Sequence, residues 1–162
     1  MDLLEVLFFC LFMIYNSVMD FLLEQIKTII DKDIPLVSNL SNVAALLYKL
    51  DNINWAGFYL VDKDTLYLGP FQGDVACTTI EKGKGVCGTC LERKASIIVP
   101  NVREFKGHIA CSSLSKSEIV VPVIKGDEVK LIIDVDSPIY DRFHKCELEF
   151  LEETSKVIEE LF

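Results

Sequence analysis

The chain has 162 residues and a mass of 18.3 kDa, which suits a single domain at about 150 residues per domain. Apolar residues make up 51% and charged residues 25%, so the composition excludes disordered and fibrous proteins. Sixteen basic residues against 25 acidic ones give a net charge of −9. Because phosphate binding needs clustered Lys and Arg, we expect no nucleic-acid partner. Six irregularly spaced cysteines are too few for a disulfide scaffold and favour functional thiols in a reducing compartment.

The N-terminus carries an apolar segment from Val6 to Tyr15. A membrane span needs about 20 apolar residues, and this segment is much shorter. A signal peptide begins with basic residues, whereas Asp2 and Glu5 precede this segment. We therefore expect residues 1–14 to be an apolar extension with no membrane role, either helical or an artefact of the assigned start, with Met13 or Met19 as alternative starts.

Hydrophobic periodicity along the rest of the chain predicts alternating helices and short strands in one compact domain. Apolar residues at helical spacing predict four helices, at 18–30, 35–50, 85–93 and 145–161. Runs bounded by Asp, Gly and Pro predict six strands, at 55–61, 65–68, 75–80, 97–99, 118–124 and 129–136. A long loop is expected at 101–115. The short turns between strands predict an α+β fold, with a central antiparallel sheet of about six strands and N- and C-terminal helices packed on it.

A glycine pattern in the middle of the chain matches the dinucleotide-binding fingerprint. Gly83, Gly85 and Gly88 have the GxGxxG spacing, after a predicted strand and at the start of a predicted helix. That fingerprint also needs a parallel strand that ends in an acidic residue about 20 residues later. Glu104 has the right spacing but lies in a predicted loop, and βα repeats are missing. Nucleotide binding is therefore disfavoured.

Four residues have a spacing that could hold zinc. Cys87-x-x-Cys90 and His108-x-x-Cys111 would supply a tetrahedral set. However, the first pair begins a predicted helix with apolar flanks, and a core of this size does not need a metal to fold. We therefore predict neither a metal nor a cofactor.

Thiol redox chemistry is a third interpretation of the same segment. Cys87 lies near the N-terminus of the predicted helix, where free backbone N–H groups favour a thiolate. Cys111 lies in a loop of small and hydroxyl residues, which can present a thiol to a small ligand. For Cys10 and Cys146 the simpler interpretation is a small buried apolar side chain.

Acidic residues occur where a strand would otherwise be apolar. The two-residue period of strand 129–136 places Asp134 and Asp136 on one face, and Glu118 lies on the preceding strand. Neighbouring carboxylates are costly unless they share a proton or meet a cation. A solvated strand end is the simpler explanation, but acids together with thiols suit a small zwitterionic ligand whose ammonium group supplies the missing charge.

The sequence resembles the free methionine-(R)-sulfoxide reductases, which are built on a GAF domain. The resemblance extends from Tyr15 to the C-terminus and is specific, because six motifs keep both their order and their spacing. These motifs are Asn54–Leu60, Leu68–Gly73, Gly83–Thr89, Gly107–Cys111, Ser115–Pro122 and Asp134–Pro138. It implies a single GAF domain at residues 15–162 that reduces free L-methionine (R)-sulfoxide.

The resemblance also implies roles for the cysteines. Cys111 would be the nucleophile that attacks the sulfoxide sulfur and becomes a sulfenic acid, and either Cys87 or Cys77 would resolve it as a disulfide. We favour Cys87. Family members are usually cytosolic, are recycled by thioredoxin, and in several cases are dimers. The chemistry agrees with the residues, because a thiolate beside a protonated carboxyl supplies both the nucleophile and the proton.

The remaining site residues are also implied by the resemblance. Glu118, Asp134 and Asp136 would hold and protonate the substrate, and Trp55 and Tyr59 would form an aromatic wall around its S-methyl end. The chain departs from the family pattern at two positions near these motifs, Cys90 and Leu131, where the family usually has small residues. The alternative function is a non-catalytic GAF module that senses a small ligand.

Overall fold

The computed structural model describes residues 3–109 and 111–162. The helices are α1 (Leu3–Ile29), α2 (Leu36–Leu47), α3 (Gly85–Arg93) and α4 (Lys145–Glu159), with a short 3-10 helix η1 (Val102–Glu104). The strands are β1 (Trp55–Asp62), β2 (Thr65–Gly73), β3 (Thr79–Glu81), β4 (Ile97–Val99), β5 (Ser117–Lys125) and β6 (Glu128–Ser137).

The strands form one six-stranded sheet in the order β3-β2-β1-β6-β5-β4. Every neighbouring pair is antiparallel, which confirms the predicted α+β architecture. A dinucleotide site at the end of a parallel βαβ unit is therefore ruled out for the described strands.

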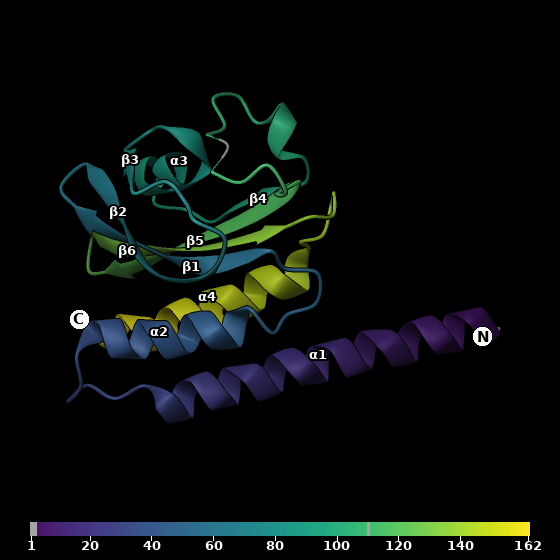
Figure 1. Cartoon of the computed structure of the whole chain (residues 1–162). Coiled ribbons are helices and arrows are strands. Elements are labelled where there is room, and N and C mark those ends of the chain that lie inside the picture. Colours follow the sequence, from purple (N-terminus) through teal and green to yellow (C-terminus); the bar gives the residue numbers. More distant parts are fainter. Residues whose placement is uncertain (1–2, 110) are drawn as a thin grey trace.

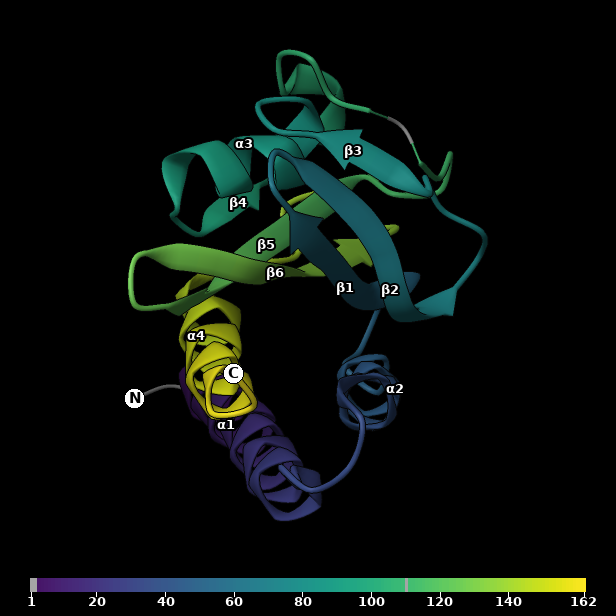
Figure 2. The same ribbon diagram turned by 90° about the vertical axis from the view of Figure 1, so that its left-hand side faces the viewer.

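Helices cover the two faces of the sheet unequally (Figures 1 and 2). On one face α2 and α4 lie against the strands, and α1 packs below them. This face has the larger apolar core, which includes Phe58 of β1, Ile119 of β5 and Ile133 of β6. The opposite face carries α3, the short helix η1 and the long loops, over a smaller core.

Polar side chains fix the outer helices to each other. Asn39 is fully buried, and its side-chain amide accepts from the backbone N–H of Asp31 at 2.9 Å and donates to the Asp31 carbonyl at 2.8 Å. Arg142, just before α4, donates to Glu147 of α4 at 2.7 Å and to the Tyr15 hydroxyl of α1. The two chain ends are therefore held together by hydrogen bonds as well as by apolar packing.

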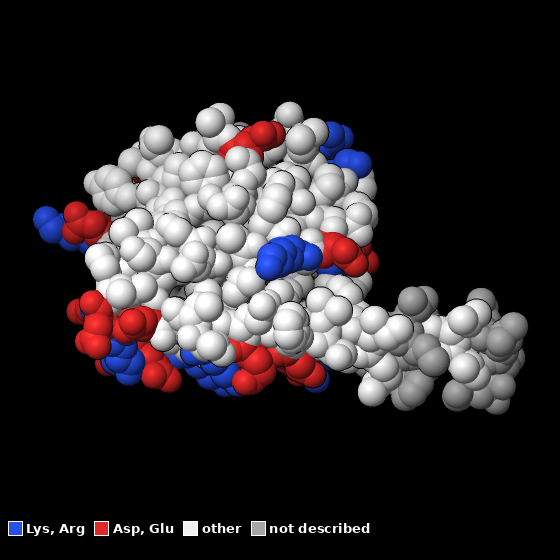
Figure 3. Space-filling model, turned by 60° about the horizontal axis from the view of Figure 1, so that its bottom comes forward, with Lys and Arg blue, Asp and Glu red and all other residues white. Residues whose placement is uncertain are grey.

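Helix α1 is longer than the sequence predicts. It begins at Leu3, so the proposed extension continues the helix without a break near residue 15. Its N-terminal part projects past the body of the domain (Figure 1), and the described side chains on the face seen in Figure 3 are uncharged there, although Glu5 lies in the first turn of the helix. Residues 1–2 of the extension lie outside the described residues. Among the described helices, none combines the length and apolar character needed to cross a membrane.

The segment between β2 and β3 differs from the prediction. Strand β2 extends to Gly73, and β3 begins only at Thr79, so residues 74–78 form a loop instead of a strand. Side chains of β1 bind the carbonyl groups of this loop. The Trp55 indole donates to the Asp74 carbonyl at 3.1 Å, and the Tyr59 hydroxyl donates to the Cys77 carbonyl at 3.0 Å. The loop is thus anchored on the face of the sheet that carries α3.

Candidate active site

Three acidic side chains gather on the face of the sheet covered by α3. In the β5–β6 register Glu118 stands opposite Asp136, and Val120 stands opposite Asp134. Residues opposite each other share a face, so all three acids point the same way, as the two-residue period predicted. Glu118 and Asp134 are buried, which excludes a solvated strand end as the explanation.

Burial and mutual repulsion favour the protonated forms of these acids. Burial raises the pKa of Asp134 to about 7. Burial also raises the pKa of Glu118 well above its ordinary value, and the charges of Asp134 and Asp136 add to that shift. The pKa of Asp136 is raised in the same way, although a hydrogen bond from Ser115 opposes the shift. The trio can therefore hold protons near neutral pH.

Helix α3 brings Cys87 to these acids, with its Sγ 3.9 Å from Glu118 Oε1. Two glycines of the GxGxxG pattern permit the approach. Gly85 adopts a φ of +60°, and a side chain on Gly88 would collide with the Glu81 carbonyl. The pattern is thus explained by a tight turn and by close packing of a helix on a strand.

The expected thiolate at Cys87 is wrong for this structure. Burial raises the pKa of Cys87 well above its ordinary value, and the charges of Asp134 and Glu118 raise it further. These effects exceed the stabilisation of a thiolate by the N-terminus of a short helix. Cys87 is therefore a protonated thiol beside the carboxyl groups.

The disulfide joins Cys111 to Cys77, with the two Cα atoms 5.4 Å apart. The pairing of Cys111 with Cys87 that we favoured is not the one in this structure, in which Cys87 is a free buried cysteine. Residues 34 apart in sequence meet because the loop anchored by Tyr59 brings Cys77 towards the 107–115 loop.

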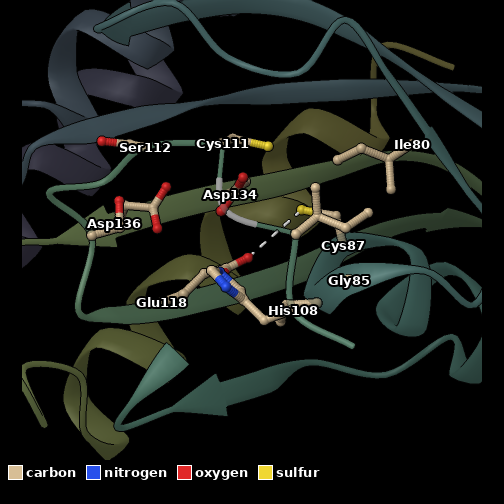
Figure 4. A pocket seen from close by; sticks show the side chains of 12 residues that line it. Ile80, Gly85, Cys87, His108, Cys111, Ser112, Glu118, Asp134 and Asp136 are labelled. Atoms are coloured by element: carbon tan, nitrogen blue, oxygen red, sulfur yellow. Dashed lines mark hydrogen bonds and ion pairs between the residues drawn. The ribbon is translucent and has the colours of Figure 1, made fainter. Parts of the chain in front are cut away.

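Thiols and acids share one small pocket (Figure 4). Among its lining residues are Cys87, His108, Cys111, Ser115 and the three acids Glu118, Asp134 and Asp136. His108 Nε2 lies 3.7 Å from Glu118 Oε2, and burial lowers the pKa of the imidazole. The sequence analysis considered His108 only as a zinc ligand and gave Ser115 no role. Whether these two side chains reach the pocket depends on the conformation of their loop, which no local pattern predicts.

The predicted aromatic wall lies behind the pocket. Trp55 and Tyr59 are buried and stacked, with ring centroids 6.0 Å apart, and neither is among the residues that line the pocket. Trp55 is the register partner of Asp136, so the rings share the face of the acids. In this structure they anchor the loop of Cys77, a role that the sequence did not suggest.

The four residues whose spacing could have held zinc do not come together as one set. Cys111 is used in the disulfide, and Cys90 is buried in the small core of this face without lining the pocket. The remaining free thiol that the structure describes, Cys146, donates to Glu147 on the opposite side of the sheet.

Comparisons with known proteins agree with this geometry. Residues 35–160 match the GAF domain family. The chain is 43% identical over 152 residues to the free methionine-R-sulfoxide reductase of Saccharomyces cerevisiae, and the match covers 88% of this chain and 84% of the yeast protein. The chain belongs to the free methionine-R-sulfoxide reductase family. The fold class and the resemblance read from the sequence are thereby confirmed.

Solved structures of this family and of GAF proteins share the fold. The free methionine-R-sulfoxide reductase of Neisseria meningitidis, solved with its substrate, is 39% identical with a TM-score of 0.86, covering 91% of this chain and 89% of that one. A putative GAF sensor protein of Burkholderia vietnamiensis is 40% identical with the same TM-score of 0.86, covering 90% and 94%. Both comparisons extend over nearly the whole domain.

Proposed function

We propose that this protein reduces free L-methionine (R)-sulfoxide to methionine by cysteine chemistry at Cys111. The observation that carries the proposal is the Cys77–Cys111 disulfide at the edge of a pocket lined by three acids. Family membership supports the same assignment, and it is the sole source of the stereochemistry and of the restriction to the free amino acid.

The reaction balances in two steps. The Cys111 thiolate attacks the sulfoxide sulfur, and a carboxyl group protonates the sulfoxide oxygen. The S–O bond of the substrate then breaks as its oxygen passes to the Cys111 sulfur, so methionine leaves and Cys111 becomes a sulfenic acid. The Cys77 thiol then attacks the Cys111 sulfur, and water leaves as the disulfide forms. Cys77 takes the resolving role here because it lies within disulfide distance, whereas Cys87 is buried against Glu118.

The acid trio would bind and protonate the substrate. The substrate ammonium brings a positive charge to a pocket whose described lining contains no Lys or Arg. Because the pKa of Asp134 is raised to about 7, a carboxyl group can hold the proton that the sulfoxide oxygen needs. Glu118 and Asp136 complete the ammonium site.

Trp55 and Tyr59 would contact the S-methyl end of the substrate in the reduced enzyme. Both rings bind the carbonyls of the loop at 74–78. Reduction of the disulfide releases Cys77, and movement of this loop would open the rings to the pocket. The aromatic rings would then pack on the S-methyl group, and this contact would leave the polar groups of the substrate free to bind the acids.

A dithiol protein must reduce the disulfide between turnovers, and thioredoxin is the proposed donor. A cytoplasmic location belongs to the same proposal, because a reducing compartment keeps the pair cycling. Neither assignment rests on a feature of the fold.

A homodimer is also proposed, through α1. Leu7, Ile14 and Phe21 recur every seven residues and are 52%, 61% and 63% exposed. Antiparallel pairing with a second copy about Ile14 would place Leu7 opposite Phe21, as a twofold axis requires. Light scattering should show a dimer that Phe21→Asp converts to a monomer, whereas Val75→Asp, at an exposed loop position on the opposite side, leaves it dimeric. A monomeric wild type would contradict the proposal.

Turnover of both epimers of free methionine sulfoxide tests the central proposal. Amino-acid analysis should show that the wild type forms methionine from the R epimer only. In Cys111→Ser the rate of methionine formation should fall by a factor of ~10³ or more, because the nucleophile is lost. Cys146→Ser, a thiol outside the pocket, is the matched control. Ligand binding without turnover in the wild type would favour the GAF sensor, and full activity of Cys111→Ser would discard the mechanism.

A further inference from the structure

We propose that the same pocket binds a zinc ion through Cys87, Glu118, Asp134 and His108, and that the bound ion excludes the substrate. The binding stands on the geometry of Cys87, Glu118 and Asp134, with His108 beside Glu118. The inhibition rests on the proposed function.

The donor atoms already lie close together. One ligand atom from each of Cys87, Glu118 and Asp134 falls within 4.8 Å of the other two, and all three residues are buried. Cys87 Sγ is 3.9 Å from Glu118 Oε1, and His108 Nε2 is 3.7 Å from Glu118 Oε2. Ligands on a tetrahedral zinc ion are roughly 3.3–3.5 Å apart, given Zn–O and Zn–N bonds near 2.0 Å and Zn–S bonds near 2.3 Å. Three of the four donors are therefore already gathered, and the His108 imidazole, which lies beside Glu118, would complete the site by moving towards Cys87 and Asp134.

An oxygen of Asp134 that lacks a hydrogen-bond partner in the described part of the chain favours a bound cation in this pocket. Asp134 is only 6% exposed, and its Oδ1 has no hydrogen-bond partner among the described residues. A buried acceptor without a donor is costly, and Asp134 lines the pocket that holds the other donors. A bound cation would satisfy this atom, as the substrate ammonium would.

The donor set selects zinc over the common hard cations. A thiolate and an imidazole suit Zn²⁺, whereas Mg²⁺ and Ca²⁺ prefer oxygen ligands and more of them. One thiolate and two carboxylates would leave a bound Zn²⁺ site with a net charge of −1. Binding replaces the thiol proton of Cys87 and any proton held by Glu118 or Asp134, so zinc binding releases these protons and weakens as the pH falls.

The site differs from the zinc set read in the sequence, because it uses neither Cys90 nor Cys111. The disulfide therefore leaves all four ligands available, and the oxidised protein should bind zinc. Glu118 and Asp134 are also two of the three acids that would bind and protonate the substrate. Zinc and substrate should thus exclude each other.

Metal titration of the oxidised protein tests the site without any assay of turnover. Cobalt(II) reports a thiolate ligand by its charge-transfer absorption, and zinc added afterwards should displace it. Cys87→Ser should weaken cobalt and zinc binding on the order of 100-fold and remove the band. Cys90→Ser, a buried thiol on the same helix, is the matched control and should bind like the wild type. Equal binding by Cys87→Ser, or no band in the wild type, would overturn the proposal.

A second pair of variants covers the case in which Cys87→Ser fails to fold. Asp134→Asn and His108→Gln keep the thiol and should each weaken zinc binding on the order of tenfold. In the turnover assay zinc should raise KM for the sulfoxide and leave kcat unchanged. A change in kcat alone would contradict the competition. A wild type that binds zinc but never turns over would remove the proposed function and leave the metal site standing.

Discussion

Strands β5 and β6 present apolar side chains on one face of the central sheet and acidic side chains on the other. Towards α1, α2 and α4, β5 and β6 present Ile119, Ile133 and Val135, which are fully buried. Towards α3, the alternating positions of these strands present Glu118, Asp134 and Asp136. The first face stabilises the domain by burying hydrocarbon, and the second gives up part of that stabilisation to concentrate carboxyl groups. The candidate active site therefore lies on the face of the sheet that fewer helices cover.

The largest effect should come from an acid placed on the wrong face. Ile133→Asp buries a carboxylate in the helix-covered core, and we expect the free energy of unfolding to fall by about 3–5 kcal/mol. Chemical denaturation measures this. Asp134→Val, the neighbouring position on the pocket face, should stay folded. Equal unfolding of the two variants would show that the faces do not differ.

A smaller effect should appear in the pH dependence of stability. The pKa of Asp134 is raised to about 7 in the folded protein, so the folded state binds more protons than the unfolded chain. The contribution of Asp134 to stability should therefore be lost as the pH rises from about 4, the ordinary pKa of this carboxyl group in the unfolded chain, through about 7, and should level off above that pH. Asp134→Asn should make the profile less steep, since Glu118 and Asp136 still titrate, and should raise the free energy of unfolding at pH 8 on the order of 1 kcal/mol. A flat profile in the wild type would contradict the assignment.

The smallest effect concerns the anchor of the Cys77 loop. Tyr59→Phe removes the hydrogen bond to the Cys77 carbonyl and should cost about 1 kcal/mol. Disulfide formation after one turnover should also slow, because Cys77 is less well positioned. Thiol titration during a single turnover measures this. Tyr67→Phe, an exposed tyrosine on β2, is the control. Unchanged kinetics in Tyr59→Phe would remove its positioning role.

Local patterns predicted most of the fold. Helix 85–93 and strand 97–99 were predicted with the bounds that the structure has, because glycine and proline mark their ends. The two-residue period placed Asp134 and Asp136 on one face. By contrast, the loop at 74–78 looked like a strand, because Val75 and Ile80 frame an apolar run. Its carbonyls instead bind side chains of β1, a tertiary contact that no local pattern encodes.

The chemistry of the cysteines was harder to predict than their presence. The position of Cys87 at the start of a helix suggested a low pKa, but burial beside two acids reverses that shift. The partner of Cys111 depends on which loop reaches it, and Cys77 does so through the anchor at Tyr59. Charge and distance in three dimensions decided both questions.

The cross-link between residues 77 and 111 encloses the whole of α3 in a covalent ring. Closing a loop between residues 34 positions apart restricts the unfolded chain and stabilises a protein by roughly 3–4 kcal/mol. Under the proposed cycle, each molecule that has spent its reducing equivalents becomes the form that best resists heat and proteolysis. When reductant is scarce, the protein would then accumulate in the stable disulfide form, which becomes active again once reductant is supplied.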